Sequence, residues 1–136
     1  MDNLIKFHHF GLAVKDFEFA LRFYSNLNYD FSKPIVDKIQ NVELIMCTSK
    51  TFPSVELIKP VNKKSPINTY LSKNNEIIYH TCYEIENYEE GIEKLFSKNR
   101  AICISKPQPA ILFKGRLVSF YYIKDVGIIE ILQKDY

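Results

Sequence analysis

Two histidines and two glutamates stand at matching places in the two halves of this sequence. His9 begins the stretch HFGLAVKDFEFALRFY and His80 begins HTCYEIENYEEGIEKL, while Glu56 and Glu130 stand in SVELIKP and IIEILQK. Burying an ionised carboxylate among aliphatic residues is costly unless a cation or strong donors compensate its charge. Two neutral imidazoles and two carboxylates match the charge of a divalent cation and suit Ni, Co, Zn, Mn or Fe. These four residues are therefore the candidate metal ligands, and an octahedral ion would keep two positions for water or substrate.

The elements that must position these residues recur in the same order in both halves. Each histidine opens a short strand that ends in an aliphatic residue, Val14 or Ile85, and a capping residue follows, Asp16 or Asn87. Asn87 with Glu90 also forms a capping-box pattern. Apolar residues at helical spacing come next, namely Phe17, Ala20, Leu21 and Tyr24 in the first half and Tyr88, Gly91, Ile92 and Leu95 in the second. About three strands rich in β-branched and aromatic residues complete each half.

This order predicts an α+β fold in a single domain, residues 1–136. The first βαβββ module spans about 5–60 and the second about 76–134. The polar segment 61–75 joins them, and Pro66 marks the start of a short helix within it.

The alternation of side chains along a strand predicts which face carries the chemistry. His9 lies on the face opposite to Leu12 and Val14, and we expect the helix to cover the face of those two apolar residues. If the halves pack with pseudo-symmetry, the imidazoles and carboxylates converge on the inner face of a curved sheet. A lone histidine in a strand is more often structural, which is our interpretation of His8, and Cys82 is interpreted as an inert buried thiol. The duplication is what favours metal binding at the four repeated positions.

Composition excludes several classes of protein. No apolar run is long enough to cross a bilayer, and the net charge of +2 comes from scattered Lys and Arg, so neither a membrane nor a nucleic acid is expected as a partner. Cys47, Cys82 and Cys103 are odd in number and lack CxxC spacing, which favours buried thiols over disulfides or a zinc site. The opening MDNLIKFHHFG lacks the pattern of a secretory signal, which predicts a cytoplasmic protein.

On these motifs the sequence resembles the vicinal oxygen chelate superfamily. The resemblance covers nearly the whole chain and rests on HHFGLAVKD, VELIKP, YHTCYEIEN and VGIIEIL. It implies two tandem βαβββ modules that form a curved, partly closed mixed β-sheet with helices on the outer face. It also implies one divalent metal ion bound by His9, Glu56, His80 and Glu130, and a homodimer, because the family commonly dimerises. The segment SPINTYLSKN before the second histidine strand is similar to the epimerase branch of the family.

The resemblance implies a metal-dependent isomerase or lyase. The expected substrate is a small acyl thioester, as for methylmalonyl-CoA epimerase, or alternatively a hemithioacetal, as for glyoxalase I. The metal would bind adjacent substrate oxygens, while Glu130, alternating with Glu56, would remove the α-proton and return it at carbon. The epimerase branch also implies a second acid before the second ligand, for which the sequence offers Asp37, Gln40 and Glu43.

Other possibilities stay open at this point. Lys114 and Arg116, in the KGR turn, either meet an anionic group of the substrate or form a solvated turn. A non-enzymatic protein that binds an antibiotic or another small molecule would furnish its pocket from the nine Tyr and ten Phe, and would need no metal. An extradiol-type dioxygenase fits less well, because its iron site uses two histidines and one carboxylate, and here a second glutamate competes for an open position.

Overall fold

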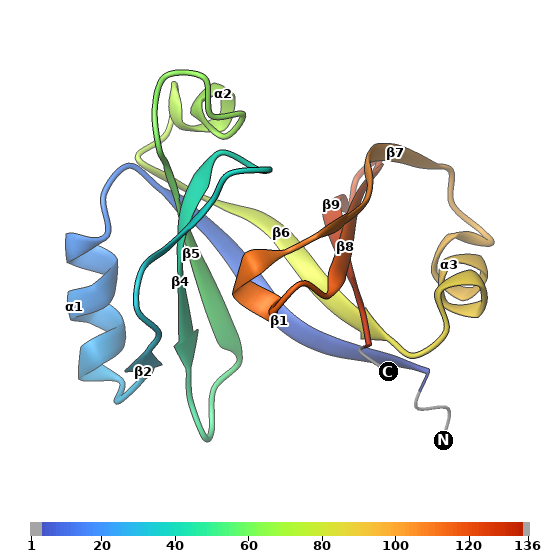
Figure 1. Ribbon diagram of the computed structural model, residues 1–136, viewed down its shortest axis with the longest axis horizontal. Helices are drawn as coiled ribbons and strands as arrows, with labels where there is room; N and C mark the ends of the chain where they lie inside the picture. Colours follow the sequence, from blue (N-terminus) through green and yellow to red (C-terminus); the bar gives the residue numbers. More distant parts are fainter. Residues whose placement is uncertain (1–3, 135–136) are drawn as a thin grey trace. The chain divides into compact units, whose positions relative to one another are not determined.

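A computed structural model describes residues 4–134, which form two compact units (Figure 1). One unit is His9–Tyr79, and the other joins the residues up to His8 with those from His80 onward. Strands β1 (Ile5–Val14) and β6 (Glu76–Ile85) each contribute residues to both units. Each half runs in the expected order of strand, helix and then further strands, and the predicted α+β class is confirmed.

In the 9–79 unit the strand order is β2-β4-β5-β1, with β3 paired to β4. The bounds are β2 (Asp30–Phe31), β3 (Ile35–Asp37), β4 (Val42–Thr48) and β5 (Ser54–Pro60). β4 runs antiparallel to β5, and β5 runs parallel to β1. Three strands were predicted after the helix, but four are present. Pro34 separates β2 from β3, and proline cannot donate a hydrogen bond to a strand ladder.

Helix α1 (Glu18–Asn26) covers one face of this sheet through the predicted apolar positions (Figure 1). Its core cluster contains Phe17, Ala20, Leu21 and Tyr24 together with Leu12 and Val14 of β1 and Ile45, Val55 and Leu57 of β4 and β5. The Asp16 carboxylate accepts a hydrogen bond from the Glu18 backbone N–H at 2.9 Å, which satisfies one of the free donors at the start of the helix. The helix therefore packs on the face opposite to that of His9, as alternation predicts.

The unit built around residues 80–134 repeats this scheme with the order β6-β9-β8-β7. Its elements are β7 (Ala101–Pro109), a 3₁₀ helix η1 (Ile111–Phe113), β8 (Leu117–Ile123) and β9 (Gly127–Gln133). β6 runs parallel to β9, and the other two pairs are antiparallel. The pairing of the histidine strand with the glutamate strand is thus parallel in both units.

Helix α3 (Tyr88–Phe96) begins as the sequence predicts. The Asn87 side chain accepts a hydrogen bond from the Glu90 backbone N–H at 3.0 Å. Tyr88, Ile92 and Leu95 pack into the cluster that contains Ile85 of β6. Gly91 faces the same strand, and this helix position requires a glycine because a Cβ there would lie 2.9 Å from Ile85 Cδ1 and 3.0 Å from its Cγ2.

Replacing Gly91 by Ala is expected to destabilise the protein, although alanine favours helix. Overpacking costs about 1–3 kcal/mol, which exceeds the gain of about 1 kcal/mol in helix propensity. Urea unfolding measures the effect, with Glu93→Ala on the exposed side of α3 as the control. Ile85→Val should recover part of the loss in the Gly91→Ala background. A Gly91→Ala protein as stable as the wild type would show that the helix shifts at little cost.

The segment between the modules is more ordered than its polar composition suggests. Pro66 was expected to start the short helix, but α2 (Asn68–Leu71) begins two residues later. Ile67 and Leu71 are buried, so they anchor the segment, and Asn68 Nδ2 donates a hydrogen bond to the Asn62 carbonyl at 2.8 Å. In the sequence, this anchoring is indicated by two apolar residues, Ile67 and Leu71, within an otherwise polar stretch.

The prediction that all three cysteines are buried is wrong for Cys103. Cys47 and Cys82 are buried, and burial raises the pKa of the Cys47 thiol to about 12. Cys103 is exposed because it lies on β7, the last strand in the order of its unit, where most side chains face solvent. Within residues 4–134 no helix has the length and apolar composition needed to cross a membrane.

Candidate functional site

The first histidine and the first glutamate are neighbours in the 9–79 unit. β1 pairs with β5 in parallel, with His9 opposite Ser54 and Gly11 opposite Glu56. His9 Nε2 lies 3.8 Å from Glu56 Oε2. His9 is 0% and Glu56 4% exposed, so this imidazole and this carboxylate are both removed from water.

The second histidine and the second glutamate form the same arrangement in the other unit. β6 pairs with β9 in parallel, with His80 opposite Ile128 and Cys82 opposite Glu130. His80 Nε2 lies 3.2 Å from Glu130 Oε1. Both residues are again buried, at 3% and 2% exposure.

The offset between histidine and glutamate is identical in the two units. In each, the glutamate stands opposite the residue two positions after the histidine, Gly11 or Cys82. Residues two apart on a strand share a face, so each unit presents one imidazole and one carboxylate on the same side. The sequence repeat is therefore also a repeat of pairing register.

The antiparallel neighbour of each glutamate strand adds an apolar side chain beside the pair. Met46 of β4 stands opposite Glu56, and Phe120 of β8 stands opposite Glu130. The Phe120 ring meets the His80 ring edge-on, with 5.6 Å between centroids. These residues were not singled out from the sequence, although the period-two pattern of their strands puts them on the glutamate face.

The donor set fits a divalent cation. Burying a carboxylate away from water costs roughly several kcal/mol unless an opposite charge compensates it. Each unit buries one such carboxylate. Each unit therefore offers two candidate ligands, His9 with Glu56 in one and His80 with Glu130 in the other. An imidazole nitrogen and a carboxylate oxygen are ligand types that suit a borderline transition metal.

His8 and Cys82 were interpreted from the sequence as structural residues, and their surroundings agree with this. The His8 ring packs edge-on against Phe113, with 5.5 Å between centroids. Cys82 is fully buried in a cluster with Val118 and Leu132.

Of the three candidates for an additional acid, Asp37 is held in a turn. Its carboxylate accepts hydrogen bonds from the backbone N–H groups of Ile39 and Gln40 and from Gln40 Nε2, each at 3.0 Å. This pattern closes the loop between β3 and β4 and occupies the Gln40 side chain as well. Asp37 and Gln40 are therefore structural.

Glu43 lies on the wrong face of β4 for the same role. Met46 stands opposite Glu56, so Leu44 and Met46 share the face of Glu56. Side chains alternate along a strand, so Glu43 points to the other face, which α1 covers. Its carboxylate lies 3.9 Å from Lys59 Nζ, and that ammonium sits over the Phe17 ring. None of the three candidates therefore offers a free carboxylate on the face of Glu56.

The KGR turn is only partly solvated. Arg116 Nη2 donates to Glu84 Oε2 at 2.6 Å and Nε donates to the Gln133 carbonyl at 2.9 Å, so this guanidinium already has protein acceptors. Lys114 is exposed and adopts a left-handed backbone conformation, with φ 56°. Of the two cations, Lys114 alone keeps an exposed side chain for an external anion.

Comparison with known proteins places these features in a family. Residues 8–120 match the Glyoxalase/Bleomycin resistance protein/Dioxygenase superfamily. The chain belongs to this superfamily. A relative from Cereibacter sphaeroides, the ethylmalonyl-CoA/methylmalonyl-CoA epimerase, is 30% identical over 122 residues, which are 88% of this chain and 90% of that protein.

Solved structures show the same fold. The methylmalonyl-CoA epimerase of Mycobacterium tuberculosis superposes with a TM-score of 0.81 at 18% identity, over 100% of this chain and 93% of that chain. A variant of the Streptomyces coelicolor methylmalonyl-CoA epimerase, solved in complex with 2-nitronate-propionyl-CoA, has a TM-score of 0.76 at 20% identity, over 98% of this chain and 100% of that chain. The predicted superfamily resemblance is confirmed, and its curated relatives are epimerases.

Proposed function

We propose that this protein is an epimerase of a small acyl thioester, of the methylmalonyl-CoA type, and that it works with one divalent metal ion. The carrying observation is the buried His–Glu pair that recurs with the same register offset, His9 with Glu56 and His80 with Glu130. When bound, the metal would polarise the thioester carbonyl and stabilise negative charge on its oxygen. The identity of the relatives supports the substrate class.

In this proposal the two glutamates carry the proton. The Glu130 carboxylate takes the α-proton, and the electrons of the broken C–H bond move into the thioester carbonyl to give an enolate. A protonated Glu56 then delivers a proton to the opposite face of the same carbon. Proton exchange with solvent resets both glutamates, so atoms and charge balance over the cycle.

A second candidate is isomerisation of a hemithioacetal, as in glyoxalase I. The observation that favours it is that Asp37 is engaged in a turn and Glu43 points to the α1 face, so neither supplies the additional acid that the epimerase branch implies. A proton shift between adjacent carbons proceeds on one face of the substrate and needs one carboxylate, whereas epimerisation needs a proton acceptor on one face and a proton donor on the other.

A parallel assay in D₂O tests the proposal. Chelator-treated protein, with and without added Co²⁺, Ni²⁺, Mn²⁺ or Zn²⁺, is incubated with methylmalonyl-CoA of one configuration. We expect metal-dependent loss of configuration together with deuterium at the α-carbon, read by mass spectrometry. The hemithioacetal of methylglyoxal and glutathione is assayed alongside. Turnover of the hemithioacetal alone would select the second candidate, and inactivity towards both with every metal would overturn the proposal.

A further inference from the structure

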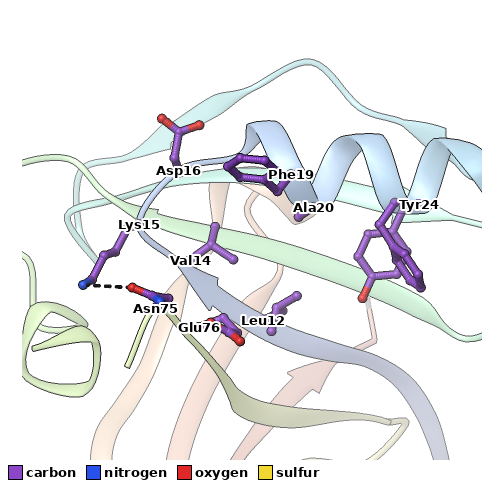
Figure 2. Close-up of a pocket in the computed structure, with 10 residues that line it drawn as sticks. Leu12, Val14, Lys15, Asp16, Phe19, Ala20, Tyr24, Asn75 and Glu76 are labelled. Atoms are coloured by element: carbon purple, nitrogen blue, oxygen red, sulfur yellow. Dashed lines mark hydrogen bonds between the residues drawn. The ribbon is translucent and has the colours of Figure 1, made fainter. Parts of the chain in front are cut away.

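A cavity of about 670 Å³ lies beside helix α1 in the 9–79 unit, on the face of β1 opposite to that of His9. Figure 2 shows Phe19 and Ala20 of the helix on one side, Leu12 and Val14 of β1 below them, and Lys15 with Asn75 at one end. Cavities of this size hold small organic molecules. The proposed proton chemistry uses none of these residues.

Two of the walls are aromatic side chains that the protein core does not need. Phe19 is 74% and Phe23 58% exposed, and they lie one helical turn apart beside the partly buried apolar stripe of α1. The duplicated half supplies an internal control, because the equivalent positions on α3 are Glu90 and Lys94. The repeat therefore folds with charged residues at these positions, and the aromatic pair is particular to the first half.

The charged residues that line the cavity carry a net negative charge. Asp16 and Glu76 provide two carboxylates against the one ammonium of Lys15, which leaves a balance of −1. Lys15 Nζ already donates to Asn75 Oδ1 at 3.4 Å. Among the residues that the structure describes, the exposed Glu76 carboxylate has no hydrogen-bond or ion-pair partner.

The aromatic wall also suits a cation. The Arg22 guanidinium lies 5.4 Å from the centroid of the Phe19 ring, so this ring already takes part in one cation–π contact. Tyr24 adds a third ring to the lining. Apolar walls combined with this net negative charge favour an amphiphilic cation over a neutral or anionic molecule.

We propose that this cavity binds a small organic ammonium ion, with its apolar body between Leu12, Phe19 and Phe23 and its charged group towards Glu76. Such a site is separate from the His–Glu pairs and does not depend on the proposed epimerase activity. Its occupant is a molecule of cavity size with one aromatic or branched apolar part and one positive charge.

Titration of the ¹⁵N-labelled full chain with three matched probes tests this site by NMR. The probes are 3-phenylpropylamine, 3-phenylpropanol and 3-phenylpropionate, which share an apolar body and differ in charge. We expect shifts confined to the amides of residues 12–24 and 75–76, and binding of the amine about fivefold tighter than that of the alcohol. The carboxylate should bind most weakly.

Variants separate the charge from the apolar wall. Glu76→Gln should reduce the preference for the amine over the alcohol, while Asp30→Asn, on the exposed strand β2, should not. Phe19→Ala with Phe23→Ala should abolish the shifts of all three probes, whereas Phe52→Ala, which removes an exposed ring outside the cavity, should leave them. Because the second half already carries charged residues at the two aromatic positions, loss of the rings is compatible with folding.

Three outcomes would overturn the proposal. Equal affinity for amine and alcohol would make the cavity a neutral apolar site. Amide shifts that depend on protein concentration and disappear in the Phe19→Ala, Phe23→Ala protein would make the aromatic pair an interface between copies of this chain. Failure of the amine to shift the amides around the cavity would show that it does not bind this ligand class.

Discussion

Replacing Glu130 by Gln is expected to lower kcat for α-proton exchange by about 10²-fold or more, because an amide cannot accept the proton that the carboxylate removes. Gln keeps the shape of the side chain and an oxygen able to ligate metal. The measurement is deuterium incorporation at the α-carbon in D₂O, with metal content determined on the same sample. Glu93→Gln, on exposed helix α3, is the matched control and should keep wild-type turnover.

The split between kcat and KM shows what the substitution removes. Loss of the proton acceptor lowers kcat and kcat/KM together, while loss of a substrate contact raises KM. Full turnover by Glu130→Gln would assign the proton transfer to another residue and leave Glu130 at most a ligand. Loss of activity together with loss of metal would leave the proton role undecided, so Glu130→Gln loaded with excess metal is assayed as well.

Removing His80 is expected to abolish stoichiometric metal binding. The wild type should carry about one transition-metal equivalent per chain by plasma mass spectrometry after reconstitution, and His80→Ala should lose on the order of tenfold or more in affinity. His9→Ala should behave in the same way because it holds the equivalent position. His8→Ala is the matched control, since His8 neighbours His9 in sequence but packs against Phe113 instead.

Measurements of protein stability test whether the loss of metal binding comes from the loss of a ligand. An alanine at position 80 leaves the buried Glu130 carboxylate without the imidazole beside it, and breaking a buried pair costs about 3–5 kcal/mol. His80→Gln keeps a polar group at this position, so it serves as a second variant in case His80→Ala fails to fold. Metal should raise the melting temperature of the wild type and of His8→Ala but not of the His9 or His80 variants. Equal metal binding by the wild type and all of these variants would place the ion elsewhere.

The elements of the fold could be read from the sequence with little error. β5 and β8 begin and end as the strand patterns indicated, and both helices bury the predicted apolar stripes. Local composition suffices for such features because burial imposes a period of two on strands and of about 3.6 on helices. The repeat predicted that the two halves share one order of elements, while the parallel pairing of the histidine strand with the glutamate strand is a finding of the structure.

Other features depend on which partners a side chain meets in the folded chain. The sequence offered Asp37, Gln40 and Glu43 for the additional acid, but turn hydrogen bonds engage the first two and strand alternation turns the third away from Glu56. Arg116 looked free in a turn but meets Glu84 of another strand. The partner of Arg116 and the strand opposite Glu43 are distant in sequence, so sequence spacing does not indicate them.

The sequence by itself determined the superfamily, the α+β class, the order of elements and the four candidate ligands, because these follow from local patterns that occur twice. The module boundaries stay a prediction, and so does the binding of one ion by His9, Glu56, His80 and Glu130, which the metal measurements test. Tertiary structure decided which acids are engaged, which cysteine meets solvent and where Phe19 and Phe23 line a cavity. Those outcomes depend on turn geometry and on packing between segments, since only the folded chain sets what lies beside a given side chain.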